Sequence, residues 1–159
     1  VLQPGGSIRF TDPGYGSLGH YEGNKGELEL PTRVYRIDGQ SGQATVVDDT
    51  LEKPNGLAFS PDYKILYVSD TGVSHKPGHP RQIHAFDVTD ANTLSAHREF
   101  CDLGNAIPDG FRVDEDGNES EGTSELPPSR REGQESRRRG RGQFESTRSA
   151  RSRKTSGSC

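Results

Sequence analysis

Short apolar stretches separated by Gly, Pro, Asp and Asn recur along the first three quarters of the chain. A typical one is Ile65-Leu66-Tyr67-Val68, which lies between two turn-forming segments. Stretches of this kind predict β-strands, and none between Pro4 and Asn118 keeps a helical period. We therefore expect an all-β fold. The expected strands are residues 7–11, 33–37, 44–47, 56–59, 65–68, 82–86 and 110–113.

The strand segments repeat along the chain. Residues 8–12 (IRFTD) correspond to residues 66–70 (LYVSD), 58 positions later. Pro54-Asn55-Gly56 corresponds to Pro108-Asp109-Gly110, 54 positions later. A period of roughly 50 residues with four strands in each unit is typical of β-propeller blades. The complete unit is expected to place its strands at 55–60, 65–70, 82–88 and 95–102, preceded by three strands in 8–49 and followed by one at 109–114.

This repeat amounts to about two blades, whereas propellers carry roughly 4–8. We therefore interpret residues 1–118 as a partial β-propeller that does not close its ring. Val1 falls within what the register makes the end of a strand, so we expect further sequence upstream. We expect a monomer or an aggregation-prone chain, because open sheet edges and an exposed blade face remain.

Charge divides the 159-residue chain into two parts. Residues 1–118 hold 10 Lys+Arg and 18 Asp+Glu, a net of −8, and residues 119–159 hold 10 and 6, a net of +4, which together give −4. The second part contains few apolar residues, so it is expected to be a disordered basic tail. This change in charge and composition falls in the middle of a blade, where no domain boundary is expected. We therefore favour a frameshift or intron read-through as the origin of the tail. The alternative is a genuine Arg/Gly- and Arg/Ser-rich arm.

Several function classes find no support in the sequence. There is no apolar run of about 18 residues that predicts a membrane span. There is no Gly-x-Ser-x-Gly elbow, phosphate-binding loop or zinc-ligand spacing. His75 and His79 flank a loop segment and are interpreted as surface residues, because a His-x₃-His metal pair belongs mainly on a helix. Nothing in the sequence assigns a cellular compartment.

Several ordered motifs, among them residues 30–38 (LPTRVYRID), resemble one family. Residues 8–16 (IRFTDPGYG) are similar to its WFTDPPYG segment, with Arg9 where the family has an aromatic residue. Residues 53–72 (KPNGLAFSPDYKILYVSDTG) are the strongest match, and residues 108–118 (PDGFRVDEDGN) complete it. Residues 1–118 therefore resemble the gluconolactonase (regucalcin-like, senescence marker protein) family. The resemblance implies a six-bladed propeller that hydrolyses sugar lactones with one divalent metal on its axis.

The resemblance also implies site residues. The family binds its metal through a Glu, two Asn and an Asp, and Asn55 and Asp109 match the second Asn and the Asp. Asp109 is also the expected general base. Such a set of oxygen ligands favours Ca²⁺, with Zn²⁺, Mg²⁺ and Mn²⁺ as alternatives. The Glu and the first Asn are expected upstream of Val1, so we expect impaired activity in this chain.

The repeat places Asn55 and Asp109 at equivalent positions of adjacent blades, which converge on the propeller axis. The competing interpretation is ordinary turn chemistry, which Asn and Asp favour. Asp12 and Asp70 also share a repeat position, and there strand-end capping is favoured over catalysis.

Two functional hypotheses remain open at this point. The first is metal-dependent hydrolysis of a small-molecule sugar lactone by a carboxylic ester hydrolase, impaired in this chain. The second is a non-enzymatic truncated propeller whose basic tail binds nucleic acid or acidic partners. The sequence alone does not decide whether this chain is an enzyme.

Overall fold

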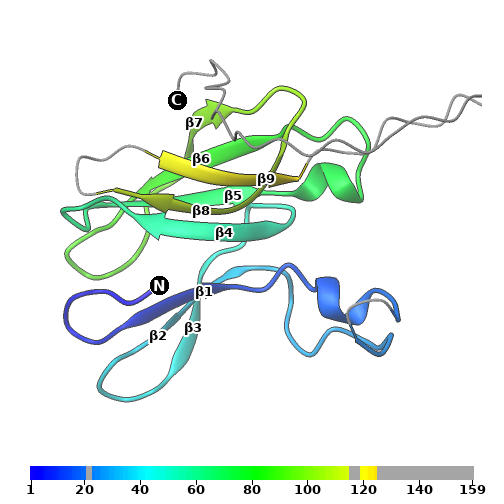
Figure 1. Ribbon diagram of the computed structural model, residues 1–159. Helices are drawn as coiled ribbons and strands as arrows, with labels where there is room; N and C mark the ends of the chain where they lie inside the picture. The colour runs from blue at the N-terminus through cyan, green and yellow to red at the C-terminus, as the bar shows by residue number, and fades with distance from the viewer. Residues whose placement is uncertain (21–22, 115–118, 125–159) are drawn as a thin grey trace, which may run out of the picture.

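The computed structural model describes residues 1–20, 23–114 and 119–124, and this part of the chain is built from β-strands (Figure 1). Two single turns of 3₁₀-helix, η1 (Tyr15–Ser17) and η2 (Gly72–Ser74), lie in connections. Neither they nor any other helix of the described residues has the length and apolar character of a membrane span. The strands are β1 (Ile8–Thr11), β2 (Val34–Ile37), β3 (Ala44–Asp48), β4 (Pro54–Phe59), β5 (Ile65–Asp70), β6 (Gln82–Asp87), β7 (Arg98–Asp102), β8 (Ile107–Val113) and β9 (Glu119–Ser124).

These strands form three antiparallel sheets in which neighbours in sequence are neighbours in space. Their orders are β1-β2-β3, β4-β5-β6-β7 and β8-β9. The four-stranded sheet is the complete unit that the repeat predicts, and the other two are the expected partial units. The all-β prediction is confirmed, and the blade organisation follows the predicted register. β7 begins three residues later than expected, because its ladder with β6 extends only as far as Ala85↔Arg98, and the chain before it returns from the turn through the isolated Val88–Leu94 bridge.

Residues 119–124 differ from the prediction of a disordered tail. They form β9, which pairs with β8 from Ile107↔Ser124 to Val113↔Glu119. Main-chain hydrogen bonds are open to any residue with an N–H, so a polar segment can pair with an available strand edge without apolar side chains. The rest of the predicted tail, residues 125–159, lies outside the described residues.

Apolar side chains fill both spaces between neighbouring sheets. Between the first and second sheets, Val34, Leu66 and Phe86 are fully buried. Between the second and third, Ile83 packs with Ala58 and Phe111. Both faces of the β4–β7 sheet are therefore covered, as the stacking of blades requires.

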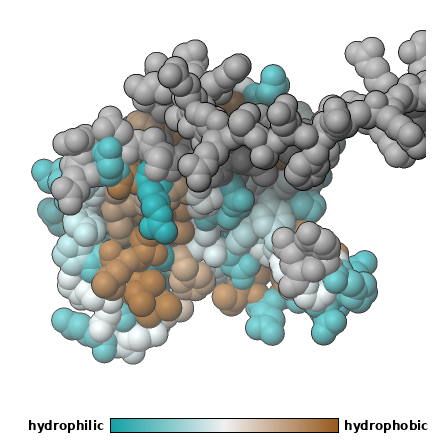
Figure 2. Space-filling view, in the orientation of Figure 1, coloured by the Kyte–Doolittle hydropathy of each residue, from teal (hydrophilic) through white to brown (hydrophobic). Residues whose placement is uncertain are grey.

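An open groove of about 1060 Å³ lies along the C-terminal halves of β4 and β8. Figure 2 shows apolar surface in the region where the N-terminal segment approaches β4 and β8. The groove is at the opposite half of these strands from Asn55 and Asp109. Its apolar lining residues are Val1, Leu2, Leu57, Ala58, Phe59, Pro61, Tyr63, Phe111 and Val113.

Arg9, which stands where the related motif has an aromatic residue, points into the space between the first two sheets. It is fully buried, and its guanidinium lies 5.9 Å from the centroid of the Phe59 ring. One nitrogen, Nη2, donates to the Asn92 carbonyl at 2.9 Å, whereas Nε and Nη1 have no partner among the described residues. Burial, and then the nearby charge of Arg36, lowers the pKa of Arg9 to about 10. An aromatic side chain would fill this position without unpaired donors.

Replacing Arg9 with methionine is therefore expected to stabilise the protein by about 1 kcal/mol, because two buried donors without partners are removed. Arg36→Met is the matched control, since Arg36 donates to both Ser7 Oγ and Asp38 Oδ2 at 2.8 Å and should lose stability when truncated. Urea unfolding of the two variants measures both effects. Equal destabilisation by the two substitutions would show that the buried Arg9 charge is well compensated.

Candidate active site

Asn55 and Asp109 lie at the same end of the molecule, near the N-terminal ends of β4 and β8. The connections β1–β2 and β5–β6, which carry η1 and η2, lie at this end as well (right-hand side of Figure 1). This arrangement follows from the antiparallel order within each sheet, which brings the start of the first strand next to the end of the second. We call this end the mouth.

The structure brings the two sequence-predicted ligands into direct contact. Asn55 Nδ2 donates a hydrogen bond to Asp109 Oδ1 at 3.1 Å, across a separation of 54 residues. The Asp109 side chain is exposed and Asn55 is half-buried, so both are accessible from the mouth. The amide of Asn55 uses its nitrogen in this contact, which leaves its oxygen free to bind a cation.

A β-bulge carries each of these residues. In β4, Pro54 pairs with Asp70 and Leu57 pairs with Val68, so Asn55 and Gly56 together lie opposite the single residue Ser69. β8 has the same irregularity, because Pro108 pairs with Thr123 and Phe111 with Glu121. Bulges bend a strand and redirect its side chains. The repeated bulge explains why equivalent side chains from adjacent sheets point at one another.

Glycine at position 56 permits this approach. A Cβ built on Gly56 would lie 2.2 Å from the Asp109 carbonyl oxygen and 3.0 Å from the Gly110 Cα. Main-chain atoms of β8 cannot give way as a flexible side chain can. The short distance between β4 and β8, and with it the Asn55–Asp109 contact, therefore requires a residue without a side chain at position 56.

Gly56→Ala is expected to push β8 away from β4 and to destabilise the protein by about 1–3 kcal/mol, the usual cost of overpacking. Gly110→Ala is the matched control, because a Cβ there meets nothing within 4 Å although it neighbours the same carboxylate. Chemical denaturation compares the two variants. A similar stability of Gly56→Ala and Gly110→Ala would contradict the close approach described above.

The loops at the mouth are tied together by polar contacts. The Tyr15 hydroxyl lies 2.5 Å from Thr71 Oγ1 and 3.0 Å from Ser74 Oγ, which joins the β1–β2 loop to the β5–β6 loop. Lys53 Nζ donates to the Pro13 carbonyl at 2.9 Å and lies 5.3 Å from the centroid of the Tyr15 ring. Sequence reasoning did not single out Tyr15 or Lys53 for these roles, since contacts between loops leave no periodic signal.

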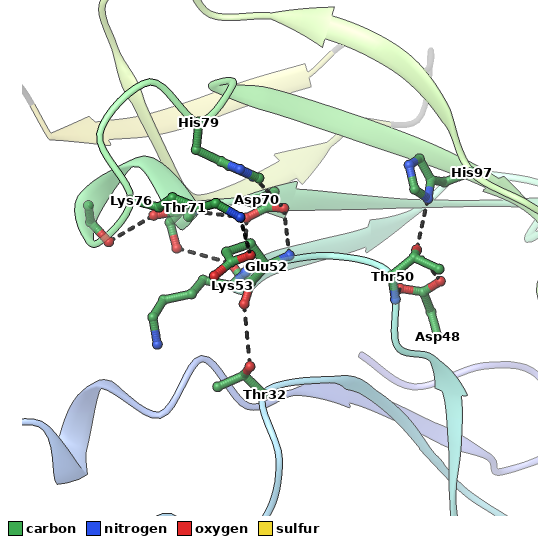
Figure 3. Close-up of polar contacts among 12 residues, drawn as sticks. Thr32, Asp48, Thr50, Glu52, Lys53, Asp70, Thr71, Lys76, His79 and His97 are labelled. Atoms are coloured by element: carbon green, nitrogen blue, oxygen red, sulfur yellow. Dashed lines mark hydrogen bonds and ion pairs between the residues drawn. The ribbon is translucent and has the colours of Figure 1, made fainter.

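Asp70 organises the base of the mouth (Figure 3). It is 2% exposed and accepts hydrogen bonds from the backbone N–H groups of Glu52, Lys53 and Gly72 at 2.8–3.0 Å. Its Oδ2 lies 3.1 Å from His79 Nε2. Burial raises the pKa of Asp70, but these donors outweigh burial and hold it below its ordinary value. The predicted capping role is confirmed, and Asp12 caps the Gly14 N–H at 2.9 Å in the same way.

The stabilisation by the Asp70 carboxylate should depend on pH. The pKa of Asp70 is lower in the folded protein than in the unfolded chain, where it is about 3.9. The stabilisation is therefore complete at a pH above the pKa of the unfolded chain. It is lost as the pH falls through the pKa of the folded protein. Asp70→Asn should cost about 2–3 kcal/mol at pH 7, typical of hydrogen bonds to a charged group. This cost should shrink below about pH 4 in urea-unfolding measurements over a pH series.

The control for this series is Asp87→Asn, which removes an exposed carboxylate paired with Arg98 at 3.0 Å and should change stability by less than about 1 kcal/mol. A cost of Asp70→Asn that stays constant from pH 7 to pH 2 would contradict the assigned role of the charge.

The histidines do not build a metal centre within the part of the chain that the structure describes. His75 is exposed beside Ser74 Oγ, whereas His79 contacts Asp70. His84 is buried and meets His97 edge to face, with ring centroids 4.6 Å apart. Among the described residues no group of three or more His, Cys, Asp or Glu side chains is arranged to hold a metal ion.

Comparison with known proteins adds independent information. The model of the SMP-30/gluconolactonase/LRE-like region matches residues 1–119. Lactonohydrolase oryH of Aspergillus oryzae is 35% identical over 107 residues, which cover 56% of this chain and 23% of that protein. The gluconolactonase of Zymomonas mobilis is 32% identical over 116 residues, which cover 71% of this chain and 32% of that protein. The chain thus spans about a quarter to a third of the length of these curated relatives.

Solved structures show the same likeness. A gluconolactonase from Xanthomonas campestris superposes with a TM-score of 0.66 and 36% identity, over 76% of this chain and 38% of that one. A luciferin-regenerating enzyme shares the fold with a TM-score of 0.54 and 21% identity. The likeness to these propeller proteins agrees with the stacked sheets described above.

Proposed function

Because the chain belongs to the SMP-30/gluconolactonase/LRE-like family, we propose that it carries part of the active site of a metal-dependent lactonase. In this proposal Asn55 and Asp109 bind a divalent cation, and Asp109 also acts as the general base. The observation that carries the proposal is the 3.1 Å contact between these two side chains at the mouth. Relatives named gluconolactonase and lactonohydrolase support sugar lactones as the substrate class.

The donor chemistry at the mouth fits a hard cation. Asn55 offers an amide oxygen, and Asp109 offers a carboxylate oxygen that the Asn55 contact does not use. Ca²⁺ takes such oxygen ligands in a flexible geometry, which favours it over Mg²⁺, Mn²⁺ and Zn²⁺. Since the proposal takes two side-chain ligands from the described residues, a complete site needs further oxygen donors. For that reason we propose that binding and catalysis are weak in this chain by itself.

A bound cation would polarise the lactone carbonyl and lower the pKa of water. The chain's own contribution is to hold and orient the base. Asp109 accepts a proton from the attacking water while the water oxygen bonds to the carbonyl carbon of the lactone. The ring C–O bond then breaks, and the departing oxygen takes up the proton held by Asp109, which yields an open-chain hydroxy acid and restores the carboxylate. Asn55 keeps the Asp109 carboxylate in place through its amide N–H.

The proposal predicts that Asp109→Asn lowers the rate of lactone hydrolysis by about 100-fold or more, because the base is lost. Hydrolysis of gluconolactone is followed in a pH-stat with Ca²⁺ present and again after chelation with EDTA. Calorimetric titration with Ca²⁺ reports binding in the same samples. Asn55→Ala should weaken Ca²⁺ binding, and EDTA should abolish hydrolysis above the uncatalysed background.

Asp90→Asn serves as the matched control, since it makes the same chemical change at an exposed residue in the β6–β7 connection. It should leave both hydrolysis and Ca²⁺ binding unchanged. Activity that survives in Asp109→Asn or in EDTA would contradict the assigned roles, as would a wild-type chain without Ca²⁺ binding.

A further inference from the structure

Two hydroxyl groups occupy equivalent repeat positions and make the same kind of contact to the next sheet. Thr11, the last residue of β1, donates from Oγ1 to the Asn55 carbonyl oxygen at 2.5 Å. Ser69, near the end of β5, donates from Oγ to the Asp109 carbonyl oxygen at 3.0 Å. In each case a strand of one sheet, β1 or β5, contacts the main chain of a candidate ligand in the first strand of the next sheet, β4 or β8.

The correspondence extends to the following residue. Asp12 Oδ1 accepts the N–H of Gly14 at 2.9 Å, and Asp70 Oδ1 accepts the N–H of Gly72 at 2.8 Å. The carboxylate therefore shapes the turn within its own sheet, while the preceding hydroxyl reaches across to the neighbouring sheet. A two-residue unit, hydroxyl then Asp, performs both tasks in two successive repeats.

Ser69 shows why the hydroxyl is suited to this position. It is fully buried and lies opposite the bulge formed by Asn55 and Gly56. The bulge interrupts the β4–β5 ladder, and Ser69 Oγ accepts the N–H of Gly56 at 2.8 Å in place of a main-chain carbonyl. The same oxygen donates its proton to the Asp109 carbonyl. One hydroxyl thus joins the bulge of β4 to the bulge of β8.

We propose that Thr11 and Ser69 are positioning residues, which fix the main chain of Asn55 and Asp109 so that their side chains meet at the mouth. The inference rests on the proposed function, in which Asn55 and Asp109 bind the cation at this point. Neither hydroxyl touches the substrate or the cation. Each acts through the carbonyl of a ligand residue, so its loss lets that residue rotate within its bulge.

The test replaces Thr11 with Val, which keeps the shape and removes the hydroxyl, and Ser69 with Ala. Thr11→Ser retains the donor and should behave like the wild type. Ser60→Ala is the matched control, because Ser60 is also buried and donates to Asp62 Oδ1 at 2.7 Å, but lies at the far end of β4. All four variants are made in the full chain, and their unfolding free energies are measured alongside.

Two readouts separate this inference from the proposed function. The first is Ca²⁺ affinity, which should fall about 10-fold in Thr11→Val and Ser69→Ala, the usual effect of losing a group that supports a metal ligand. The second needs no metal: the side-chain amide resonances of Asn55 in metal-free protein should shift in the same two variants. The Ca²⁺ affinity and the Asn55 amide resonances should both stay at their wild-type values in Ser60→Ala and Thr11→Ser.

The inference is overturned if the Asn55 amide resonances in Thr11→Val and Ser69→Ala match those of the wild type, or if Ser60→Ala moves them equally. A wild-type chain that binds no Ca²⁺ contradicts the proposed function, and the amide resonances then still decide whether the two hydroxyls position Asn55. Affinity lost in step with stability in all variants would show a general effect of unfolding and would overturn the inference as well.

Discussion

The close approach of β4 and β8 is the constraint on which the candidate site depends. Gly56 faces the Asp109 carbonyl with no room for a Cβ, and Ser69 bonds to both strands at this point. Apolar side chains between the sheets do not fix how the sheets are rotated relative to one another, because hydrophobic packing is non-directional. The narrow contact at Gly56 and the directional bond from Ser69 select one rotation. The 3.1 Å contact between Asn55 and Asp109 is a consequence of that selection.

The sequence predicts most of the fold because the repeat is explicit in it. The pair Pro54-Asn55-Gly56 and Pro108-Asp109-Gly110 locates the first strands, and the short apolar segments in residues 65–70 and 82–88 locate the next two. The same repeat predicts that Asn55 and Asp109 lie close together. It does not reveal the bulges, because a bulge is a property of how two strands pair. β9 was missed for a related reason, since its pairing uses main-chain groups that composition does not report.

Features of single residues were harder to predict. Arg9 departs from the aromatic residue of the family motif, and the sequence could not fix which way it points. The structure places it fully buried, with two nitrogens that lack partners among the described residues. Tyr15 and Lys53 join loops that are distant in sequence, so no pattern could have paired them. Thr11 and Ser69 were visible as a repeat position, but their contacts appear only when neighbouring sheets are placed together.

Titration of the isotope-labelled chain with Mn²⁺, followed by NMR, tests whether a cation binds between Asn55 and Asp109. Paramagnetic Mn²⁺ broadens the signals of nearby nuclei and uses the same oxygen ligands as other hard cations. If the cation binds there, the signals of the Asn55 side-chain amide and of the Gly56 and Asp109 backbone amides broaden first, and EDTA restores them. Broadening that begins at another acidic segment, such as Asp48-Asp49, while the Asn55 signals stay sharp would contradict binding there.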